Sequence, residues 1–143
     1  MKLQPDKFDV QSITGHGAGW ISVGSVTPAG ARAEKIESSV ILGARGERVD
    51  WNCRSFAELT PEHFAQLATM NAEIVIFGSG VRNRFVPPAW LKPLIARRIG
   101  LETMDTAAAC RTYNVLASEG RHVVAALLLE MAASGATPLN PER

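Results

Sequence analysis

Four large apolar residues at positions 74–77 stand directly before the short run Gly78-Ser79-Gly80. A segment that is apolar at every position predicts a strand buried on both faces of a sheet. The two glycines allow a sharp turn at its end, where larger side chains would resist one. In α/β proteins such a turn is a usual place for a ligand, so this corner is the reference point for the rest of the chain.

The first third of the chain alternates apolar and polar residues, which is typical of strands with one buried and one exposed face. The alternation predicts four strands, at residues 7–13, 20–26, 35–42 and 49–51. Turns rich in glycine and proline separate them. The same alternation indicates antiparallel pairing with one face exposed to solvent, so we expect a β-meander.

At residue 60 the hydrophobic period changes to that of a helix. Thr60 is a typical helix N-cap and Pro61 a typical first helical residue, so a helix is predicted to run to about residue 70. The pattern further predicts helices over 88–98 and 107–118, and strands over 74–77, 101–104 and 121–129.

Individual residues are expected to set the ends of these later elements. Pro93 would either kink the second helix or mark the beginning of its regular part, and Gly100 would close it. Asp105 or Thr106 is expected to cap the third helix, and Gly120 to end it. The last strand is almost entirely apolar, so we expect it in the middle of the sheet.

The order α-β-α-β-α-β from residue 60 onward predicts an α/β fold in which helices cover a largely parallel sheet. A chain of 143 residues is long enough for one such domain. We therefore expect a single globular domain over residues 1–130. Residues 131–143 are rich in alanine, proline and glycine, and we expect them to form a flexible tail.

The composition is that of an ordinary globular protein, with 46% hydrophobic and 20% charged residues and a formal net charge of +1. Basic residues are nevertheless concentrated in residues 81–111, where six Lys and Arg stand against two Asp and Glu. This segment is either a surface for an anionic ligand or partner, or a solvated helix face. No basic stripe interleaved with aromatic residues accompanies the charge, so nucleic acid is not favoured as a partner.

The two cysteines, Cys53 and Cys110, show neither a CxxC motif nor the spacing of metal ligands. No metal site, cofactor or disulfide framework is therefore predicted, and the three histidines are interpreted as structural or surface residues. The first ten residues lack the apolar core of a signal peptide, and the longest apolar run, residues 123–129, is far too short to span a bilayer. We expect no membrane span and a reducing, cytoplasmic location.

A candidate pocket is expected where the glycine corner and the start of the third helix meet at one edge of the sheet. It comprises Gly78, Ser79, Gly80, Asp105, Cys110 and Arg111. The glycine corner would either bind an anion through its backbone N–H groups or be only a tight turn. It lacks both the third glycine of a dinucleotide fingerprint and the Gly-Lys-Ser/Thr of a P-loop.

Cys110 and Arg111 each allow two interpretations. A nucleophilic Cys110 needs a lowered pKa, for which its distance from the helix start gives little help, and the alternative is a small buried side chain. Arg111 would either hold a carboxylate or phosphate group, or pair with Asp105 or Glu102. On a regular helix Cys110, Arg111 and Tyr113 point in different directions, so no catalytic residue is assigned.

A candidate partner surface comprises Arg82, Arg84, Phe85, Trp90 and Arg97. It combines basic charge with apolar side chains beside a proline-rich segment, which is typical of a surface that binds another protein. A Trp90 that faces the core is the alternative.

The second half of the chain resembles a small family of largely uncharacterised proteins that includes mitochondrial complex I (NADH dehydrogenase) assembly factor 3. The segments that carry the resemblance are residues 76–80, 100–106, 107–116 and 119–121. The most specific pattern is Met-Asp-Thr at residues 104–106 followed by Ala-Cys-Arg-Thr-Tyr-Asn at residues 109–114. The resemblance extends over residues 7–130, and the N-terminal meander matches in general character.

The resemblance implies a single three-layer domain with a mixed central sheet, helices against it and an additional β layer. It also implies a role through protein contacts, because the eukaryotic member is an assembly factor and the bacterial members have no established enzymatic activity. We therefore expect a non-enzymatic binding or assembly protein with an unidentified protein partner. The alternative is an enzyme or a protein that binds a small anionic molecule, with a pocket at the C-terminal ends of the parallel strands.

Overall fold

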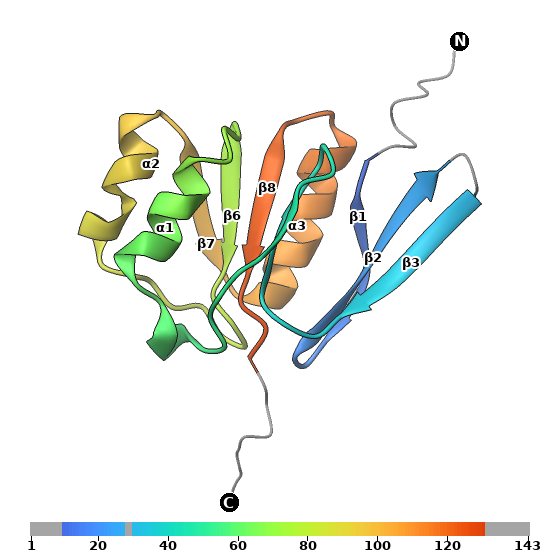
Figure 1. Cartoon of the computed structure of the whole chain (residues 1–143), viewed down its shortest axis with the longest axis horizontal. Helices are drawn as coiled ribbons and strands as arrows, with labels where there is room; N and C mark the ends of the chain where they lie inside the picture. Colours follow the sequence, from blue (N-terminus) through green and yellow to red (C-terminus); the bar gives the residue numbers. More distant parts are fainter. Residues whose placement is uncertain (1–9, 28–29, 131–143) are drawn as a thin grey trace, which may run out of the picture.

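The computed structural model describes residues 10–27 and 30–130, which form two β-sheets and three α-helices (Figure 1). The smaller sheet has the strand order β1-β2-β3, with β1 (Ser12–Gly17), β2 (Trp20–Thr27) and β3 (Gly30–Ile36). The larger sheet has the order β5-β4-β8-β6-β7, with β4 (Val40–Gly43), β5 (Arg48–Asp50), β6 (Ile74–Gly78), β7 (Gly100–Met104) and β8 (Val123–Leu127). The helices are α1 (Pro61–Ala68), α2 (Lys92–Ala96) and α3 (Thr106–Ser118), and 3-10 turns form at Phe56–Glu58 and Pro88–Leu91.

The larger sheet is mixed, as the family resemblance implies. β6 runs parallel to both β7 and β8, whereas β4 runs antiparallel to β8 and to β5. β8 is the middle strand and all five of its residues are buried, which confirms the position expected from its apolar sequence. The parallel strands β6, β7 and β8 all end at the same edge of this sheet.

The larger sheet separates two hydrophobic cores. Val75 and Phe77 of β6 are buried in the core that lies under α1 and α2. Ile76, between them, belongs to the opposite core together with Tyr113 of α3 and Ile21 of β2. This alternation places α3 between the two sheets (Figure 1), which confirms the three-layer arrangement with an additional β layer.

β1, β2 and β3 form the antiparallel meander expected at the N-terminus, but the prediction of one strand over 35–42 was wrong. Residues up to Ile36 belong to β3, whereas β4 begins at Val40 and joins the other sheet. The buried Ser39 occupies the break, where its hydroxyl accepts a hydrogen bond from the Leu129 N–H (2.9 Å) and its carbonyl accepts one from the Trp51 N–H (3.0 Å). The first strand begins at Ser12, and residues 7–9 of the predicted one lie outside the described part of the chain.

The structure of α2 decides between the two roles predicted for Pro93 and corrects the role predicted for Gly100. Pro93 lies in the first turn of α2, directly after a 3-10 turn, so it marks the beginning of the regular helix. Gly100 does not close the helix. Arg98 takes the left-handed conformation (φ 59°), and the Ile99 N–H donates to the Leu94 carbonyl (3.0 Å), which together form a Schellman motif. Gly100 instead begins β7.

The ends of α1 and α3 agree with the sequence. Thr60 and Pro61 begin α1, and Asp105 caps α3 by accepting a hydrogen bond from the Ala108 N–H at 2.8 Å. Gly120 follows α3 with a positive φ of 82°. The flexible tail at 131–143 lies outside the described residues and stays a prediction.

Candidate functional site

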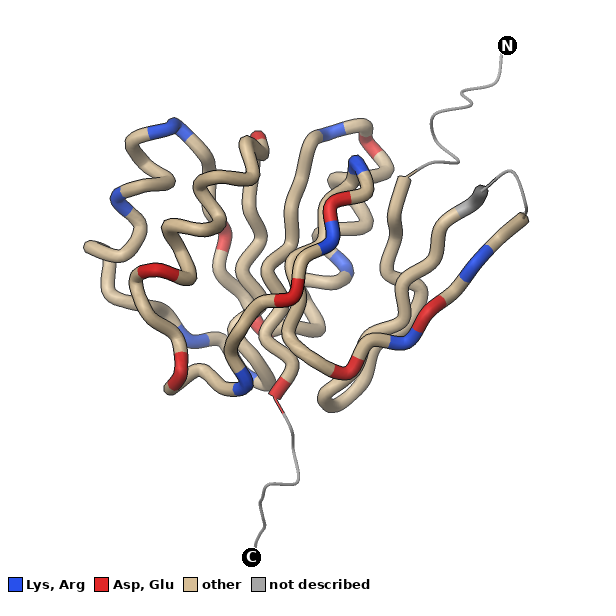
Figure 2. Tube along the Cα trace, in the orientation of Figure 1, with Lys and Arg blue, Asp and Glu red and all other residues tan. Residues whose placement is uncertain are grey.

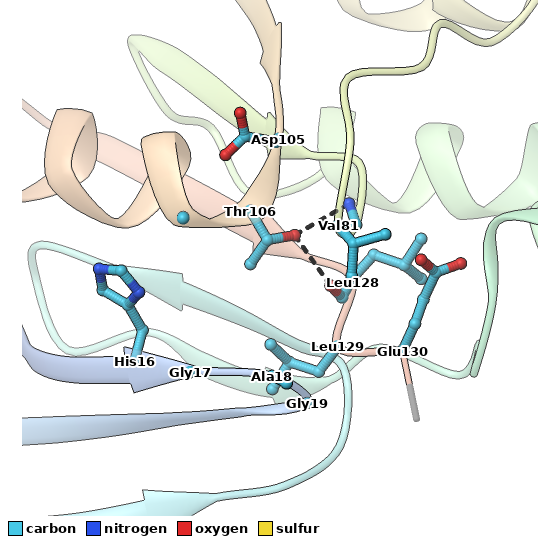
Figure 3. Close-up of a pocket in the computed structure, with 12 residues that line it drawn as sticks. His16, Gly17, Ala18, Gly19, Val81, Asp105, Thr106, Leu128, Leu129 and Glu130 are labelled. Carbon is cyan, nitrogen blue, oxygen red and sulfur yellow. Dashed lines mark hydrogen bonds between the residues drawn. The ribbon is translucent and has the colours of Figure 1, made fainter. Parts of the chain in front are cut away.

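A cavity of about 230 Å³ lies at the edge of the larger sheet where the parallel strands end (Figure 3). Four segments line it: the β1–β2 turn at 16–19, residues 80–81 after β6, residues 105–107 at the start of α3, and residues 128–130 after β8. The topology brings the last three segments together because their strands are parallel and adjacent. The β1–β2 turn comes from the other sheet, so the cavity lies between the two sheets.

Thr106 connects three of these segments. Its hydroxyl accepts a hydrogen bond from the Gly80 N–H (2.9 Å) and donates one to the Leu128 carbonyl (2.9 Å), as Figure 3 shows. Its own N–H donates to the Gly80 carbonyl at 2.8 Å. The first residue of α3 therefore fixes three of the four segments that line the cavity relative to one another.

The glycine corner does not offer free backbone donors to an anion. The Ser79 N–H donates to the Met104 carbonyl (2.8 Å), and the Gly80 N–H is already bonded to Thr106. No helix begins directly after the corner, so the positive end of a helix dipole is missing as well. These contacts favour the interpretation of the corner as a structural turn.

Gly78 is required by close packing between β6 and α3. A Cβ atom there would come within 3.1 Å of the Thr106 Cα, the Ala109 Cβ and the Leu127 Cδ2. Gly78 is thus a contact between strand and helix and does not line the cavity.

Ser79 is fully buried and holds the loop that follows β6. Its hydroxyl donates toward the carbonyls of Arg82 (3.0 Å) and Met104 (3.1 Å) and accepts from the Arg84 N–H (2.9 Å). Because these partners satisfy the hydroxyl, Ser79 is a positioning residue for the loop at 79–87.

Of the remaining pocket candidates, Asp105 and Gly80 line the cavity, whereas Cys110 and Arg111 do not. Cys110 is 1% exposed, and burial raises the pKa of its thiol to about 12. Burial likewise raises the pKa of the Cys53 thiol to about 12. Arg111 is exposed on α3. Burial and the raised pKa therefore disfavour a thiolate nucleophile at both cysteines.

Arg84 is held inside the fold by contacts that the sequence did not predict. Its guanidinium donates to the Glu130 carboxylate (2.7 Å) and to the Ser79 carbonyl (2.7 Å), and it lies 4.6 Å from the centre of the Phe56 ring. Glu130 also accepts a hydrogen bond from the Phe56 N–H at 3.0 Å. The one sequence signal for Glu130 is its place as the first charged residue after the buried run at 123–129.

The candidate partner surface is divided by the structure. Trp90 is half-buried against Phe64, with ring centroids 6.2 Å apart, and Arg97 donates to the Ala68 carbonyl at 2.9 Å, so both help to hold α1 and α2 together. Arg82 and Phe85, by contrast, are exposed on the loop after β6.

Residues 81–85, here called the 81–85 loop, expose two large apolar side chains. Val81 is 72% exposed and Phe85 is 71% exposed, with Arg82 exposed between them. Val81, which the sequence interpretation missed, also lines the cavity. The loop thus joins an exposed apolar surface to the rim of the pocket.

The basic segment at 81–111 does not form one surface. Its charges are distributed over the 81–85 loop, α2 and α3, and Figure 2 shows basic positions separated along the chain trace. α2 covers one face of the larger sheet and α3 the other. Within the cavity lining there are two carboxylates, Asp105 and Glu130, and no Lys or Arg. This lining does not favour an anion.

Two further features are absent from the described residues. They contain no group of three or more His, Cys, Asp or Glu side chains placed to hold a metal ion. Within 10–27 and 30–130, no helix is long and apolar enough to cross a membrane.

Comparison with known proteins gives a family match over most of the chain. A family model described as a protein of unknown function (DUF498/DUF598) matches residues 13–128. Among curated proteins, the NADH dehydrogenase (ubiquinone) 1 alpha subcomplex assembly factor 3 of Bos taurus is 38% identical over 82 residues, which are 56% of this chain and 45% of the relative. The same factor of Homo sapiens is 37% identical, with 56% and 45% covered. The chain thus spans less than half the length of the curated relatives that it matches.

Solved structures agree with the fold over nearly the whole chain. A crystal structure of a Bordetella parapertussis protein has a TM-score of 0.72 and 32% identity, and covers 85% of this chain and 98% of that one. A solution structure of a Mth938-like domain from Bordetella pertussis has a TM-score of 0.71 and 26% identity, with 94% and 96% covered. An NMR structure of a Xanthomonas campestris protein has a TM-score of 0.68 and 32% identity, with 90% and 92% covered.

Proposed function

We propose that this chain, which belongs to the DUF498/DUF598 family of proteins of unknown function, is a non-enzymatic binding protein that contacts a protein partner through the 81–85 loop. The observation that carries the proposal is that Val81 and Phe85 remain 72% and 71% exposed on a loop whose backbone is fixed. Large apolar side chains that gather on one short surface segment typically mark an interaction site.

The loop is held in its shape before any partner binds. Ser79 bonds the backbone of the loop at Arg82 and Arg84, and the Arg84 side chain is bonded to Glu130. A loop that is already ordered loses less conformational entropy on binding, which increases affinity for a given contact area. The rigid presentation of Val81 and Phe85 therefore supports a role in recognition.

The exposed charge indicates what kind of partner would fit. Arg82 stands between Val81 and Phe85 in the sequence and is exposed. A complementary surface would offer an apolar groove for Val81 and Phe85 with an Asp or Glu side chain at its border, because guanidinium pairs well with carboxylate.

The names of the curated relatives support this mode of action. Assembly factors act by contacting other proteins, and the relatives carry that name. Because the match covers less than half of their length, our proposal concerns binding through protein contacts and not the identity of the complex. We also propose a cytoplasmic location, which fits the two free cysteines.

The experiment is site-specific photo-crosslinking in cells, with a photoreactive residue introduced at Phe85 and, as a matched control, at Ile95. Ile95 is also an exposed apolar residue, 66% exposed, but it lies on α2. We expect a discrete crosslinked protein from position 85 that is lost in a Val81→Ser, Arg82→Glu variant. Equal capture from both positions, or capture that is insensitive to these substitutions, would contradict the proposal.

A small-molecule role is the second candidate, and the cavity beside Asp105 is the observation that favours it. Its volume of about 230 Å³ is below the range of about 300–1,000 Å³ that is usual for drug-sized ligands, so a ligand would be small. The Asp105 carboxylate in the lining favours a neutral or cationic molecule over an anion, whereas Glu130 is already paired with Arg84. Ligand binding would raise the melting temperature by mass action. A screen of small amines, amides and carboxylates in which no compound shifts Tm would contradict this second candidate.

A further inference from the structure

β3 is an edge strand of the smaller sheet, and the side of β3 that faces away from β2 is open. Among the described residues no strand pairs with this edge, and Figure 1 shows β3 at the outer margin of the molecule. Residues 30–35 are exposed throughout, so neither face of that part of the strand is covered. An uncovered edge strand is a template for pairing with another strand.

The hydrogen bonds of Ile13 determine which residues of β3 direct their backbone groups to the open edge. The N–H and C=O of Ile13 are both bonded to the Asn114 side chain, so they point away from β2. Val23, which is opposite Ile13, must then direct its backbone groups to β3, where it is opposite Glu34. Because this direction alternates along a strand, the outward N–H and C=O groups belong to Ala31, Ala33 and Lys35.

We propose that β3 pairs through this edge with the β3 of a second copy of the chain, antiparallel and symmetric about Ala33. This pairing joins the two smaller sheets into one continuous sheet with about six new backbone hydrogen bonds, two for each directly bonded pair. Arg32 then lies opposite the partner's Glu34, and by symmetry Glu34 lies opposite the partner's Arg32. The strand is complementary to itself in charge, as a two-fold interface requires.

The other symmetric registers do not fit. Pairing centred on Arg32, Glu34 or Lys35 would put two like charges directly opposite each other, which is unfavourable. Pairing centred on Ala31 would use only the first three residues of the strand. In the register centred on Ala33, Arg32 and the partner's Glu34 form a pair without backbone bonds, in which side chains approach most closely.

The charged side chains of β3 are arranged so that this contact remains available. Glu34 is bonded by both of its oxygens to Arg48 of β5 (2.6 and 2.7 Å), on the face that it shares with Ile36, and 59% of its side chain stays exposed. The Arg32 side chain forms no hydrogen bond or salt bridge with any described residue, whereas its backbone is paired with Ser25 of β2. A second arginine can therefore approach the Glu34 carboxylate from the open edge.

The test measures the molar mass of the full chain by light scattering over a range of protein concentrations. We expect the mass of two chains at high concentration. Ala33→Pro removes one outward N–H and leaves the bonds to β2 in place, so this variant is expected to stay folded by circular dichroism and to have the mass of one chain. A wild-type chain that is monomeric throughout, or an Ala33→Pro dimer as stable as the wild type, would overturn the proposal.

Charge reversal tests the register even if Ala33→Pro does not fold. Arg32→Glu alone and Glu34→Arg alone each place like charges opposite each other and are expected to be monomeric. An equimolar mixture of the two restores opposite charges at both positions and is expected to form a heterodimer. Arg48→Gln, which removes only the contact within the chain, is the control and is expected to dimerise. A mixture that stays monomeric, or single variants that dimerise as the wild type does, would overturn the register.

Discussion

Asn114 on α3 pairs with Ile13 on β1 as a neighbouring strand would. Its side-chain oxygen accepts a hydrogen bond from the Ile13 N–H (2.9 Å), and its side-chain NH₂ donates one to the Ile13 carbonyl (2.7 Å). The adjacent Tyr113 hydroxyl donates to the Gln11 carbonyl at 2.6 Å. Two consecutive residues of α3 thus hold the β1 edge of the smaller sheet, which is opposite the open β3 edge.

Replacing Asn114 with alanine should loosen the smaller sheet. Two partly buried backbone groups of Ile13 lose their partner, which we expect to lower the free energy of unfolding by about 1–3 kcal/mol. Urea unfolding measures the loss, and hydrogen exchange of β1 amides shows where it occurs. Val115→Ala, at an exposed neighbouring position (55% exposed), is the control and should change little. Unchanged β1 exchange in Asn114→Ala would contradict this role.

The parts of the fold that the sequence predicted are those set by local contacts. Thr60 and Pro61 begin α1, and Asp105 caps α3 by bonding the backbone three residues later. These contacts lie within one turn of helix, so the residue types at those positions were enough to predict where each helix begins. The break between β3 and β4 at Ser39 was not predicted, because the hydrogen-bond partners of Ser39, Trp51 and Leu129, are far away in the sequence. The local pattern of residues 35–42 therefore resembled one continuous strand.

The site was predicted less well for a similar reason. Parallel topology correctly placed Gly80 and Asp105 at one edge of the sheet. The wall formed by residues 16–19 comes from the other sheet, and Arg84 is paired with a residue 46 positions away. Contacts between residues so far apart in the sequence depend on how the two sheets pack against each other, and a local sequence pattern does not predict that packing.

Gly78→Ala should be destabilising, whereas Gly100→Ala should be tolerated. A Cβ at Gly78 would be 3.1 Å from the Thr106 Cα, a backbone atom that cannot easily move, and overpacking of this kind costs about 1–3 kcal/mol. At Gly100 the nearest atom to a new Cβ is the Ile74 Cγ1 at 3.8 Å, an ordinary contact. Thermal unfolding of both variants is the measurement. Equal melting temperatures would show that β6 and α3 are less tightly packed than described.

The pair of Glu47 and His122 should make the free energy of unfolding depend on pH in the acidic range. Their side chains are 2.6 Å apart and connect the β4–β5 turn to β8. Burial acts to raise the pKa of Glu47, but hydrogen bonds from His122 and the backbone outweigh it and hold this pKa below its ordinary value of 4.5. A carboxylate with a lowered pKa stabilises the fold above its unfolded pKa, and this contribution is lost as pH falls through the folded value.

We therefore expect the difference in unfolding free energy between the wild type and Glu47→Gln to shrink progressively as pH falls through 4.5 and below. Urea unfolding at a series of pH values measures this difference. The exposed carboxylates Glu34 and Glu73 also have a lowered pKa, each because of a hydrogen bond from an arginine. Both proteins keep those pairs, so their contribution cancels in the difference, and a difference that stays the same below pH 4.5 would contradict this role of Glu47.

Both thiols should be unreactive in the folded protein. Burial raises the pKa of Cys53 and of Cys110 to about 12, so the thiolate is scarce at neutral pH and the sulfur atoms are shielded. Reaction with a disulfide reagent should be slow in buffer and should reach two thiols per chain only in denaturant. Rapid reaction of one thiol under native conditions would contradict this prediction and would support a role for that cysteine as a nucleophile.

Ser79→Ala should release the 81–85 loop without unfolding the domain. The hydroxyl bonds the loop backbone at Arg82 and Arg84, and losing about 1.4 kcal/mol of local stability would raise the open population about tenfold. Trypsin cleaves after arginine, so cleavage after Arg82 should become about tenfold faster, because cleavage follows the open population when reclosing is fast. Cleavage after Arg98, at the end of α2, is an internal control and should keep its rate. If both rates rise together, the substitution has lowered global stability, and Ser79 is then not a positioning residue for the loop.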